Sequence, residues 1–319
     1  MLTQRELEIL LSIIDIDEEK TITRLAEELN LSIYRVSTLT NQLLKKGLIT
    51  ITKTGKYKII TPTPTKPILI LKNIKSKYSH MPLSKILTGN NLKLLSILKP
   101  GEFYNTKTLL LKTNLPKSSL YNVINNLSNY GMIKKSDNKY SLIEKYSLFH
   151  EFSKEYITLQ NYITAKKFTL DSTILWSGID EFILATRTYK NPTNKFQLTE
   201  LSKFKDYGLP LIGRNVYHYY YSKKNIQLTI EDVMIHSLFV DYSPRTLLYA
   251  IVLAFAYRKN LNKKKLLDLG LKFDIKVDIL FNYLEGREHK YPYPSLKEVY
   301  EVYNMYFGVL NDRQRVYCE

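Results

Sequence analysis

A stretch of sequence near the N-terminus returns 84 residues later in the same order. Residues 30–49, NLSIYRVSTLTNQLLKKGLI, align with residues 114–133 without a gap. Six of these 20 positions are identical, and several others match in apolar character. A repeat of this kind indicates one supersecondary unit that is used twice. The identical pairs are Asn30/Asn114, Leu31/Leu115, Asn41/Asn125, Leu43/Leu127, Gly47/Gly131 and Ile49/Ile133.

The first copy predicts three helices followed by a β-hairpin, within residues 1–61. Apolar residues recur at helical spacing in TQRELEILLSII, and a short helix is expected from Thr23 to Glu28. Ser32 is a good N-cap for a third helix that runs to about Lys46 and ends at Gly47. LITITKT and YKII then predict two short strands around a glycine turn. This is the element order of a winged helix-turn-helix.

The second copy predicts the same unit within residues 90–143, and the remaining chain divides into three parts. Residues 62–89 are expected to be a linker, because TPTPTKP is a stiff, extended sequence and the ILILK after it reads as a strand. Residues 144–168 predict one connecting helix, and residues 169–319 predict a mixed α/β C-terminal domain. The expected fold class is mainly α with small β wings, in two winged helix-turn-helix units, plus that α/β domain.

The positive charge is concentrated in the part of the chain that holds the repeat. The whole chain has a formal net charge of +17. Residues 29–143 contain 19 Lys and Arg but only two acids, Glu102 and Asp137, so this window alone accounts for the excess. General lysine abundance does not explain why acids are missing here. The pattern favours a polyanionic partner, since lysine and arginine release condensed counterions when they bind phosphate.

The third helix of the first copy predicts a face that reads duplex DNA. Val36, Leu39, Leu43 and Leu44 form an apolar stripe, and the opposite face carries polar and basic residues. Arginine reads guanine, Asn and Gln read adenine, and the shorter polar residues and Lys fix the backbone. An ordinary solvated face is the alternative, but no acid occurs from Asn30 to Ile60. The candidate residues are Ser32, Tyr34, Arg35, Thr38, Asn41, Gln42, Lys45 and Lys46, with Lys53, Lys56 and Lys58 on the wing.

The matching helix of the second copy is polar but nearly uncharged. Leu120, Val123 and Leu127 are expected to be buried. The exposed side is compatible with DNA reading, and equally with packing against the first unit or another protein. The candidates here are Lys117, Ser118, Ser119, Tyr121, Asn122 and Asn125, together with Asn126, Asn129 and the lysines that follow, Lys134, Lys135 and Lys139.

No complete catalytic, cofactor or metal motif occurs in the sequence. The five histidines are scattered, and neither a Walker loop nor Gly-x-Gly-x-x-Gly is present. WSGID (Trp176–Asp180), which we expect to lead into an apolar helix, suggests a nucleotidyltransferase-like opening. The paired carboxylates that such chemistry needs do not follow in VYHYYYS, whose tyrosines we expect to pack in a strand. The sequence therefore predicts no enzyme and no cofactor.

The sequence also predicts an intracellular protein. Arg5, Glu6 and Glu8 make the N-terminus unlike a signal peptide. The longest apolar run, Leu247–Tyr257, has 11 residues, whereas a membrane-spanning helix needs about 20. The single cysteine, Cys318, can form no internal disulfide. These features favour a cytoplasmic location and no membrane partner.

Two parts of the chain resemble known families. Residues 1–61 resemble winged helices of the MarR/TrmB type. The segment from Ile230 to Leu284, with SPRTLLYA at its centre, resembles the C-terminal domain of AbiEi-like antitoxins, in which a nucleotidyltransferase-derived domain has usually lost its activity. The family commonly has Asp where this chain has Tyr249, and it carries one winged helix instead of two. The resemblance implies promoter binding by the N-terminal part and a C-terminal module for a partner or for dimerisation.

The combined expectation is a transcriptional regulator that binds duplex DNA through its winged helices. Its expected protein partners are a toxin or the transcription machinery, or a second copy in a homodimer. Two alternatives remain: a nucleotidyltransferase-like enzyme that acts on nucleic acid, and a protein-interaction scaffold of the transcription machinery.

Overall fold

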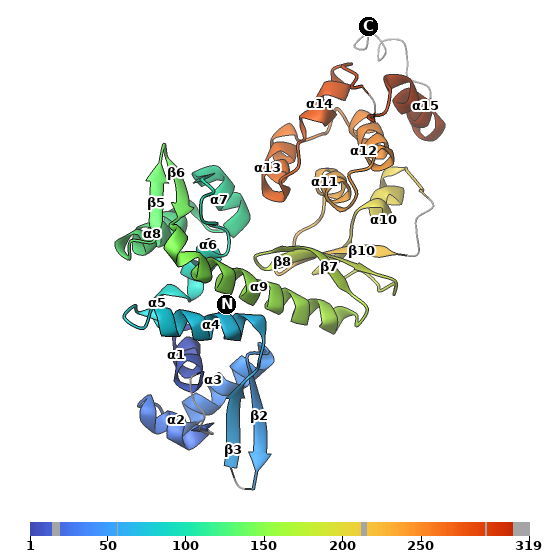
Figure 1. Cartoon of the computed structure of the whole chain (residues 1–319). Helices are drawn as coiled ribbons and strands as arrows, with labels where there is room; N and C mark the ends of the chain where they lie inside the picture. The colour runs from blue at the N-terminus through green and yellow to red at the C-terminus, as the bar shows by residue number, and fades with distance from the viewer. Residues whose placement is uncertain (15–19, 56, 212–215, 291, 309–319) are drawn as a thin grey trace. The chain divides into compact units, whose positions relative to one another are not determined.

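The computed structural model describes residues 1–14, 20–55, 57–211, 216–290 and 292–308 of the 319-residue chain (Figure 1). The chain divides into two compact units, Met1–Thr164 and Ala165–Glu319. Helices and small antiparallel sheets build both units, which agrees with the predicted mainly α class with minor β structure.

Unit 1 contains the same series of elements twice. The first series ends with a helix that follows the hairpin, and the second does the same. The first comprises α1 (Gln4–Ile13), β1 (Lys20–Thr21), α2 (Ile22–Glu28), α3 (Ile33–Lys45), β2 (Ile49–Thr54), β3 (Tyr57–Pro62) and α4 (Lys66–Lys77). After α5 (Leu83–Ile86), the second comprises α6 (Gly89–Leu95), β4 (Tyr104–Asn105), α7 (Thr106–Thr113), α8 (Lys117–Asn129), β5 (Ile133–Ser136), β6 (Lys139–Leu142), the 3₁₀ turn η1 (Glu144–Tyr146) and α9 (Ser147–Phe168).

The offset of 84 residues found in the sequence also relates the structural elements. It superposes the start and end of α3 on those of α8, and the two residues of β1 on those of β4. The two three-stranded sheets have equivalent orders, β1-β3-β2 and β4-β6-β5, and both are antiparallel. We name the two series repeat 1 (Gln4–Lys77) and repeat 2 (Gly89–Phe168).

Equivalent residues form the cores of the two repeats. The stripe on α3 that faces inward is Val36, Leu39 and Leu43, and its counterpart on α8 is Leu120, Val123 and Leu127; all six are buried. The predicted Ser32 cap is confirmed, since its hydroxyl accepts a hydrogen bond from the Arg35 N–H at 3.2 Å. Leu44, which we expected in the stripe, is exposed, and the buried position belongs to Thr40. The Thr40 hydroxyl is satisfied by donating to the carbonyl oxygens of Val36 and Ser37.

The segment 62–89, expected as a linker with a strand, contains the helices α4 and α5. The strand prediction for ILILK is wrong, because Ile68, Leu71 and Ile74 lie at helical spacing on a buried face of α4. Pro67 occupies the first turn of that helix, where a missing N–H costs nothing. The predicted connecting helix over residues 144–168 is observed as α9, after the turn η1.

Unit 2 combines a four-stranded antiparallel sheet with helices. The strand order is β7-β8-β10-β9. The helices follow on one face of the sheet, with α11 packed on α12 and α13, and α12 also on α14 and α15 (Figure 1). The strands are β7 (Thr173–Gly178), β8 (Glu181–Thr186), β9 (Phe196–Leu198) and β10 (Tyr217–Ser222). The helices are α10 (Leu201–Phe204), the 3₁₀ turn η2 (Lys205–Tyr207), α11 (Ile230–Val240), α12 (Pro244–Ala256), α13 (Lys263–Phe273), α14 (Asp278–Leu284) and α15 (Leu296–Phe307).

Both faces of this sheet are covered. Ile183 and Tyr220 belong to the core that contains α11 and α12, whereas Phe182, Leu184 and Tyr219 pack with Ala165 and Phe168 at the end of α9. The strand expected at VYHYYYS is confirmed as β10. The apolar helix expected after WSGID is wrong: the residues form strand β8, paired with β7 through a tight turn.

The glycines that end α3 and α8 offer a matched test of the repeat. Gly47 and Gly131 both have positive φ values, 68° and 63°. A Cβ at Gly131 would meet nothing within 4 Å, whereas a Cβ at Gly47 would lie 3.0 Å from Ile163 Cδ1. Gly131→Ala is therefore expected to lower the free energy of unfolding by about 1 kcal/mol, the cost of the left-handed backbone alone. Gly47→Ala should cost more, because Ile163 must also move.

Urea unfolding followed by far-UV circular dichroism measures both variants. Gly55→Ala is the control for the left-handed backbone in an open hairpin turn, since no atom lies within 4 Å of a Cβ there. Equal losses for Gly47→Ala and Gly131→Ala would contradict the contact with Ile163.

Candidate nucleic-acid interface

The outward face of α3 is polar, basic and exposed. Tyr34, with 82% of its surface exposed, lies beside Arg35, and Asn41, Gln42 and Lys45 continue the face along the helix. Thr38 is half-buried and donates a hydrogen bond to the Tyr34 carbonyl at 3.0 Å. Ser32 is exposed but acts as the helix cap. The six side chains of Tyr34, Arg35, Thr38, Asn41, Gln42 and Lys45 therefore lie on one surface of the helix, whereas Ser32 caps its start.

The β2–β3 hairpin brings two lysines opposite each other. Lys53 and Lys58 are cross-strand partners in the antiparallel register, and both are exposed. Like charges at directly opposed positions destabilise a sheet, so this pair weakens the isolated hairpin. A polyanion would remove that repulsion. Lys56, the third predicted wing residue, lies outside the described residues.

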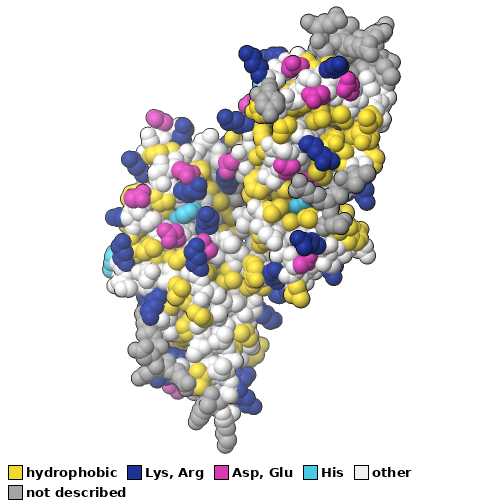
Figure 2. Space-filling model, turned by 45° about the vertical axis from the view of Figure 1, so that its right-hand side comes forward, with side chains coloured by type: hydrophobic (Ala, Val, Ile, Leu, Met, Phe, Trp, Pro, Cys, Tyr) yellow, Lys and Arg dark blue, Asp and Glu magenta, His cyan; other side chains and the backbone are white. Residues whose placement is uncertain are grey.

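The basic residues of this surface lack acidic partners. Within the described ranges, no carboxylate forms an ion pair with Arg35, Lys45, Lys53 or Lys58. Figure 2 shows the same trend at the lower end of the view, around the β2–β3 hairpin of Figure 1, where Lys and Arg are frequent and acidic side chains are few. Lys66, elsewhere in unit 1, pairs with Glu155 at 2.7 Å. Arg35, Lys45, Lys53 and Lys58 thus form a group of exposed cations on the face that contains α3 and its hairpin.

Lys46 differs from its neighbours on α3. Its ammonium group pairs with the carboxylate of Glu6, which is completely buried, and donates to the Met1 carbonyl at 3.1 Å. Glu6 also accepts hydrogen bonds from the backbone and hydroxyl of Thr3 in a capping box. We therefore assign Lys46 to the fold of repeat 1 instead of the interface.

The outward face of α8 is exposed and uncharged. Ser118, Tyr121, Asn122 and Asn125 are exposed, and Ser119 is half-buried. This face does not pack against repeat 1, so that alternative for it is wrong. At the helix start Lys117 is exposed, and Lys134, Lys135 and Lys139 extend the exposed surface onto the β5–β6 hairpin. Lys134 lies over the ring of Phe103, with 5.8 Å between its Nζ and the ring centroid.

The sequence reasoning missed two apolar residues on the α3 surface. Ile33 and Leu44 are 57% and 42% exposed. The exposure of Ile33 could have been predicted, because this residue lies outside the 3/4 spacing of the buried stripe. Exposed apolar side chains beside polar readers suit contact with the methyl groups of thymine.

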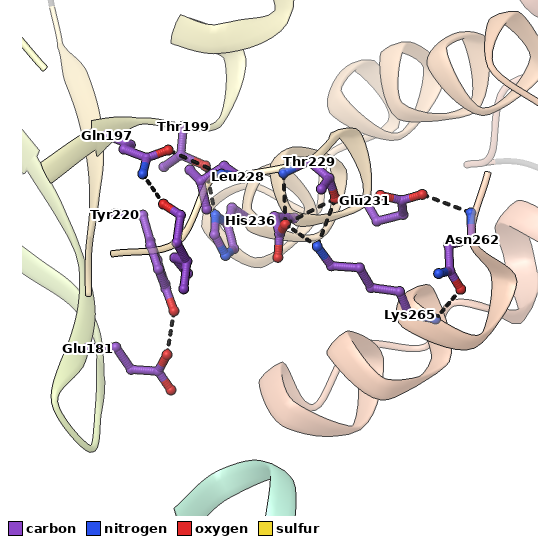
Figure 3. A network of polar contacts seen from close by, with 12 residues as sticks. Glu181, Gln197, Thr199, Tyr220, Leu228, Thr229, Glu231, His236, Asn262 and Lys265 are labelled. Atoms are coloured by element: carbon purple, nitrogen blue, oxygen red, sulfur yellow. Dashed lines mark hydrogen bonds and ion pairs between the residues drawn. The ribbon is translucent and has the colours of Figure 1, made fainter. Parts of the chain in front are cut away.

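Unit 2 contains a polar network, buried around Glu181, Tyr220 and His236, that links its sheet to its helices (Figure 3). The Glu181 carboxylate accepts a hydrogen bond from the Tyr220 hydroxyl and pairs with Lys272 at 2.7 Å. Burial, followed by the nearby Glu181 charge, holds the pKa of Tyr220 well above its ordinary value. The pair therefore consists of a carboxylate and a neutral phenol, held between β8, β10 and α13.

A second part of the network joins the start of α11 to α13. Lys265 donates to the Thr229 hydroxyl at 2.8 Å and pairs with Asp232. The Glu231 carboxylate accepts from the Asn262 backbone N–H at 2.8 Å (Figure 3). These acids are thus engaged in holding two helices together. Among the described residues, no three His, Cys, Asp or Glu side chains are grouped to hold a metal ion.

His236 lies in the same core without an ionic partner of its own. Its Nδ1 is 2.7 Å from the Thr199 hydroxyl, and its ring stacks on Tyr220 with 4.7 Å between centroids. Burial lowers its pKa from 6.5 to about 3; the Asp232 charge opposes this, and Lys272 and Lys265 reinforce it. His236 is therefore neutral in the folded protein across the physiological range.

The comparisons concern the C-terminal half of the chain. A family model described as HVO_2833_C, C-terminal, matches residues 193–307, which begin before β9 and end with α15. A search of curated proteins finds no match to the chain. Among the residues that the structure describes, no helix has both the length and the apolar character needed to cross a membrane.

The adjacent lysines at the end of α3 offer a test of their different roles. Lys46→Met is expected to destabilise unit 1 by about 3 kcal/mol, because it leaves the buried Glu6 carboxylate without its cation. Lys45→Met, which changes an exposed side chain, should cost less than about 0.5 kcal/mol. Amide hydrogen exchange in α1 and α3 measures the loss of stability in each variant. Equal protection in the two variants would refute the structural role of Lys46.

The depressed pKa of His236 predicts a pH dependence of stability. The unfolded chain binds a proton below about pH 6.5, whereas the folded chain does not until about pH 3. The free energy of unfolding of unit 2 should therefore decrease as the pH is lowered from about 6.5 towards 3. Protonation of His236 in the unfolded chain contributes about 1.4 kcal/mol per pH unit to this decrease. Urea titrations between pH 6.5 and 5, followed by the fluorescence of Trp176, the single tryptophan, measure it. The variant His236→Gln should lose this dependence of the unfolding free energy on pH. The control His80→Gln, which changes an exposed histidine, should retain it.

Proposed function

We propose that this protein is a transcriptional regulator that binds duplex DNA through two winged helix-turn-helix units. In each repeat the third helix would enter the major groove, and the hairpin after it would contact the phosphate backbone as a wing. The order of helices and strands in both repeats is compatible with this fold.

The observation that carries the proposal is the surface formed by α3 and the β2–β3 hairpin. Arg35, Asn41 and Gln42 supply base-reading groups on a regular helix, and Lys53 and Lys58 oppose each other on the hairpin. Opposed lysines without carboxylate partners favour a ligand with a dense row of negative charges. A phosphate backbone meets this requirement, and a neutral protein surface does not.

The C-terminal unit contributes in another way. The acids and lysines of its polar network, Glu181, Glu231, Asp232, Lys265 and Lys272, hold its own sheet and helices together, which supports a structural or partner-binding role over catalysis. We propose that it binds a protein partner, a toxin or a component of the transcription machinery, or a second copy of the chain, as the resemblance to AbiEi-like antitoxins implies.

The binding experiment separates base reading from phosphate contact. Full-length protein is first used to select duplexes from a random pool, and the affinities of variants are then measured between about 50 and 200 mM salt. Arg35→Ala is expected to lose about 1–3 kcal/mol of discrimination at one guanine position while retaining most non-specific affinity. Lys58→Ala should weaken all duplexes alike and reduce the salt slope by about one unit.

Lys259→Ala, at an exposed position in unit 2, is the matched control. If it lowered affinity and salt slope as much as Lys58→Ala, the interface on repeat 1 would be refuted. The absence of any duplex binding by the folded wild-type protein would reject DNA binding itself.

A further inference from the structure

Repeats 1 and 2 each include the helix that follows the hairpin. The offset of 84 places α4 (Lys66–Lys77) on residues 150–161, inside α9 (Ser147–Phe168). The helix after the hairpin is therefore part of the repeated unit, and α4 and α9 are equivalent elements.

Two side-chain contacts relate these equivalent helices, and their order shows that the helices run in opposite directions. Lys66, at the start of α4, pairs with Glu155 in the middle of α9 at 2.7 Å. Tyr78, just after α4, contacts Phe149 near the start of α9, with 5.1 Å between ring centroids in an edge-to-face arrangement. Tyr78 also contacts Tyr146, with 5.8 Å between the two ring centroids. An element and its symmetry mate pack in this antiparallel way across the interface of a twofold dimer.

The two candidate reading faces nevertheless differ in composition. Asn41 and Asn125 are the single identical pair among six equivalent positions of the outward faces. Where α3 has Arg35 and Lys45, α8 has Ser119 and Asn129, so the face of α3 is charged and that of α8 is not. The equivalent pairs are Tyr34/Ser118, Arg35/Ser119, Thr38/Asn122, Asn41/Asn125, Gln42/Asn126 and Lys45/Asn129.

The chemistry of the α8 face selects one kind of base pair. Asn122, Asn125 and Asn129 recur at helical spacing and are all exposed. An asparagine amide matches the donor and acceptor of adenine in the major groove, whereas guanine is read best by arginine. The face of α8 contains no arginine. The exposed Lys134, Lys135 and Lys139 on the following hairpin still provide phosphate contacts.

We propose that one chain occupies two adjacent half-sites of a single duplex and that these half-sites differ in sequence. Repeat 1 reads a half-site that contains a guanine, through Arg35, and repeat 2 reads an A·T-rich half-site, through its asparagines. A symmetric dimer requires a palindromic operator, but this internal pair of unlike readers requires an asymmetric one. The inference rests on the DNA binding proposed above.

The test starts from duplexes that full-length protein selects from a random pool. We expect a non-palindromic consensus with an A·T-rich half, and one protein chain per duplex by native mass spectrometry. A palindromic consensus bound by two chains would overturn the inference while leaving the proposed DNA binding intact. Failure to select any duplex would reject both.

Variants of the two helices then assign each half-site. The double variant Asn122→Ala with Asn125→Ala is expected to lose preference, by about tenfold or more in affinity, at adenines of the A·T-rich half alone. Arg35→Ala should alter the other half alone. Asn73→Ala, an exposed asparagine on α4, is the matched control and should change neither. An unchanged consensus with the double variant would overturn the role of α8, and circular dichroism confirms that the variant is folded.

The spacing between half-sites provides an independent readout. Inserting about 5 base pairs between them turns one half-site to the opposite side of the duplex. Because one covalent unit holds both readers, this insertion should reduce affinity at least about tenfold. Unchanged affinity would show that the two repeats do not bind the duplex together.

Discussion

The antiparallel contact between α4 and α9, through Lys66–Glu155 and Tyr78–Phe149, links the two repeats of unit 1. A unit of about 60 residues buries only about 60% of the surface that its unfolded chain exposes, so three short helices and a hairpin have a marginal core. The helix after each hairpin adds further buried apolar residues to the core. Ile68, Leu71 and Ile74 of α4, and Phe149, Phe152 and Tyr156 of α9, are all buried.

Local signals in the sequence predicted much of this fold. The constant offset of 84, the Ser32 cap and the glycines after α3 and α8 predicted the order and the ends of these two helices. Two apolar runs were assigned to the wrong structure, in opposite directions. ILILK was expected as a strand and is helical, and EFILAT was expected as a helix and is strand β8. A short continuous apolar run does not distinguish a buried helix from a strand that is covered on both faces. Phe182 and Ile183 enter different cores on the two faces of the sheet, which periodicity alone does not reveal.

The candidate interface shows the same division between local and long-range information. Helical spacing correctly placed Arg35, Asn41 and Lys45 on an outward face. It did not distinguish Lys45 from Lys46, because the partner of Lys46 is Glu6, 40 residues earlier in the chain. The opposition of Lys53 and Lys58 likewise depends on the strand register, which the tight hairpin turn determines. The polar network of unit 2 was not foreseen, since its members come from β8, β10, α11 and α13 and lie near each other only after folding.

Because the two repeats belong to one chain, dilution of the protein does not separate them. Two halves that assemble as separate chains come apart at low concentration, whereas α4 and α9 belong to one chain, so their effective concentration does not depend on the amount of protein. The occupancy of the proposed DNA site would then vary with the first power of protein concentration instead of its square. Each repeat has its own stretch of sequence, so a substitution in α3 leaves α8 unchanged. The differing faces of α3 and α8 are the outcome that such independence permits.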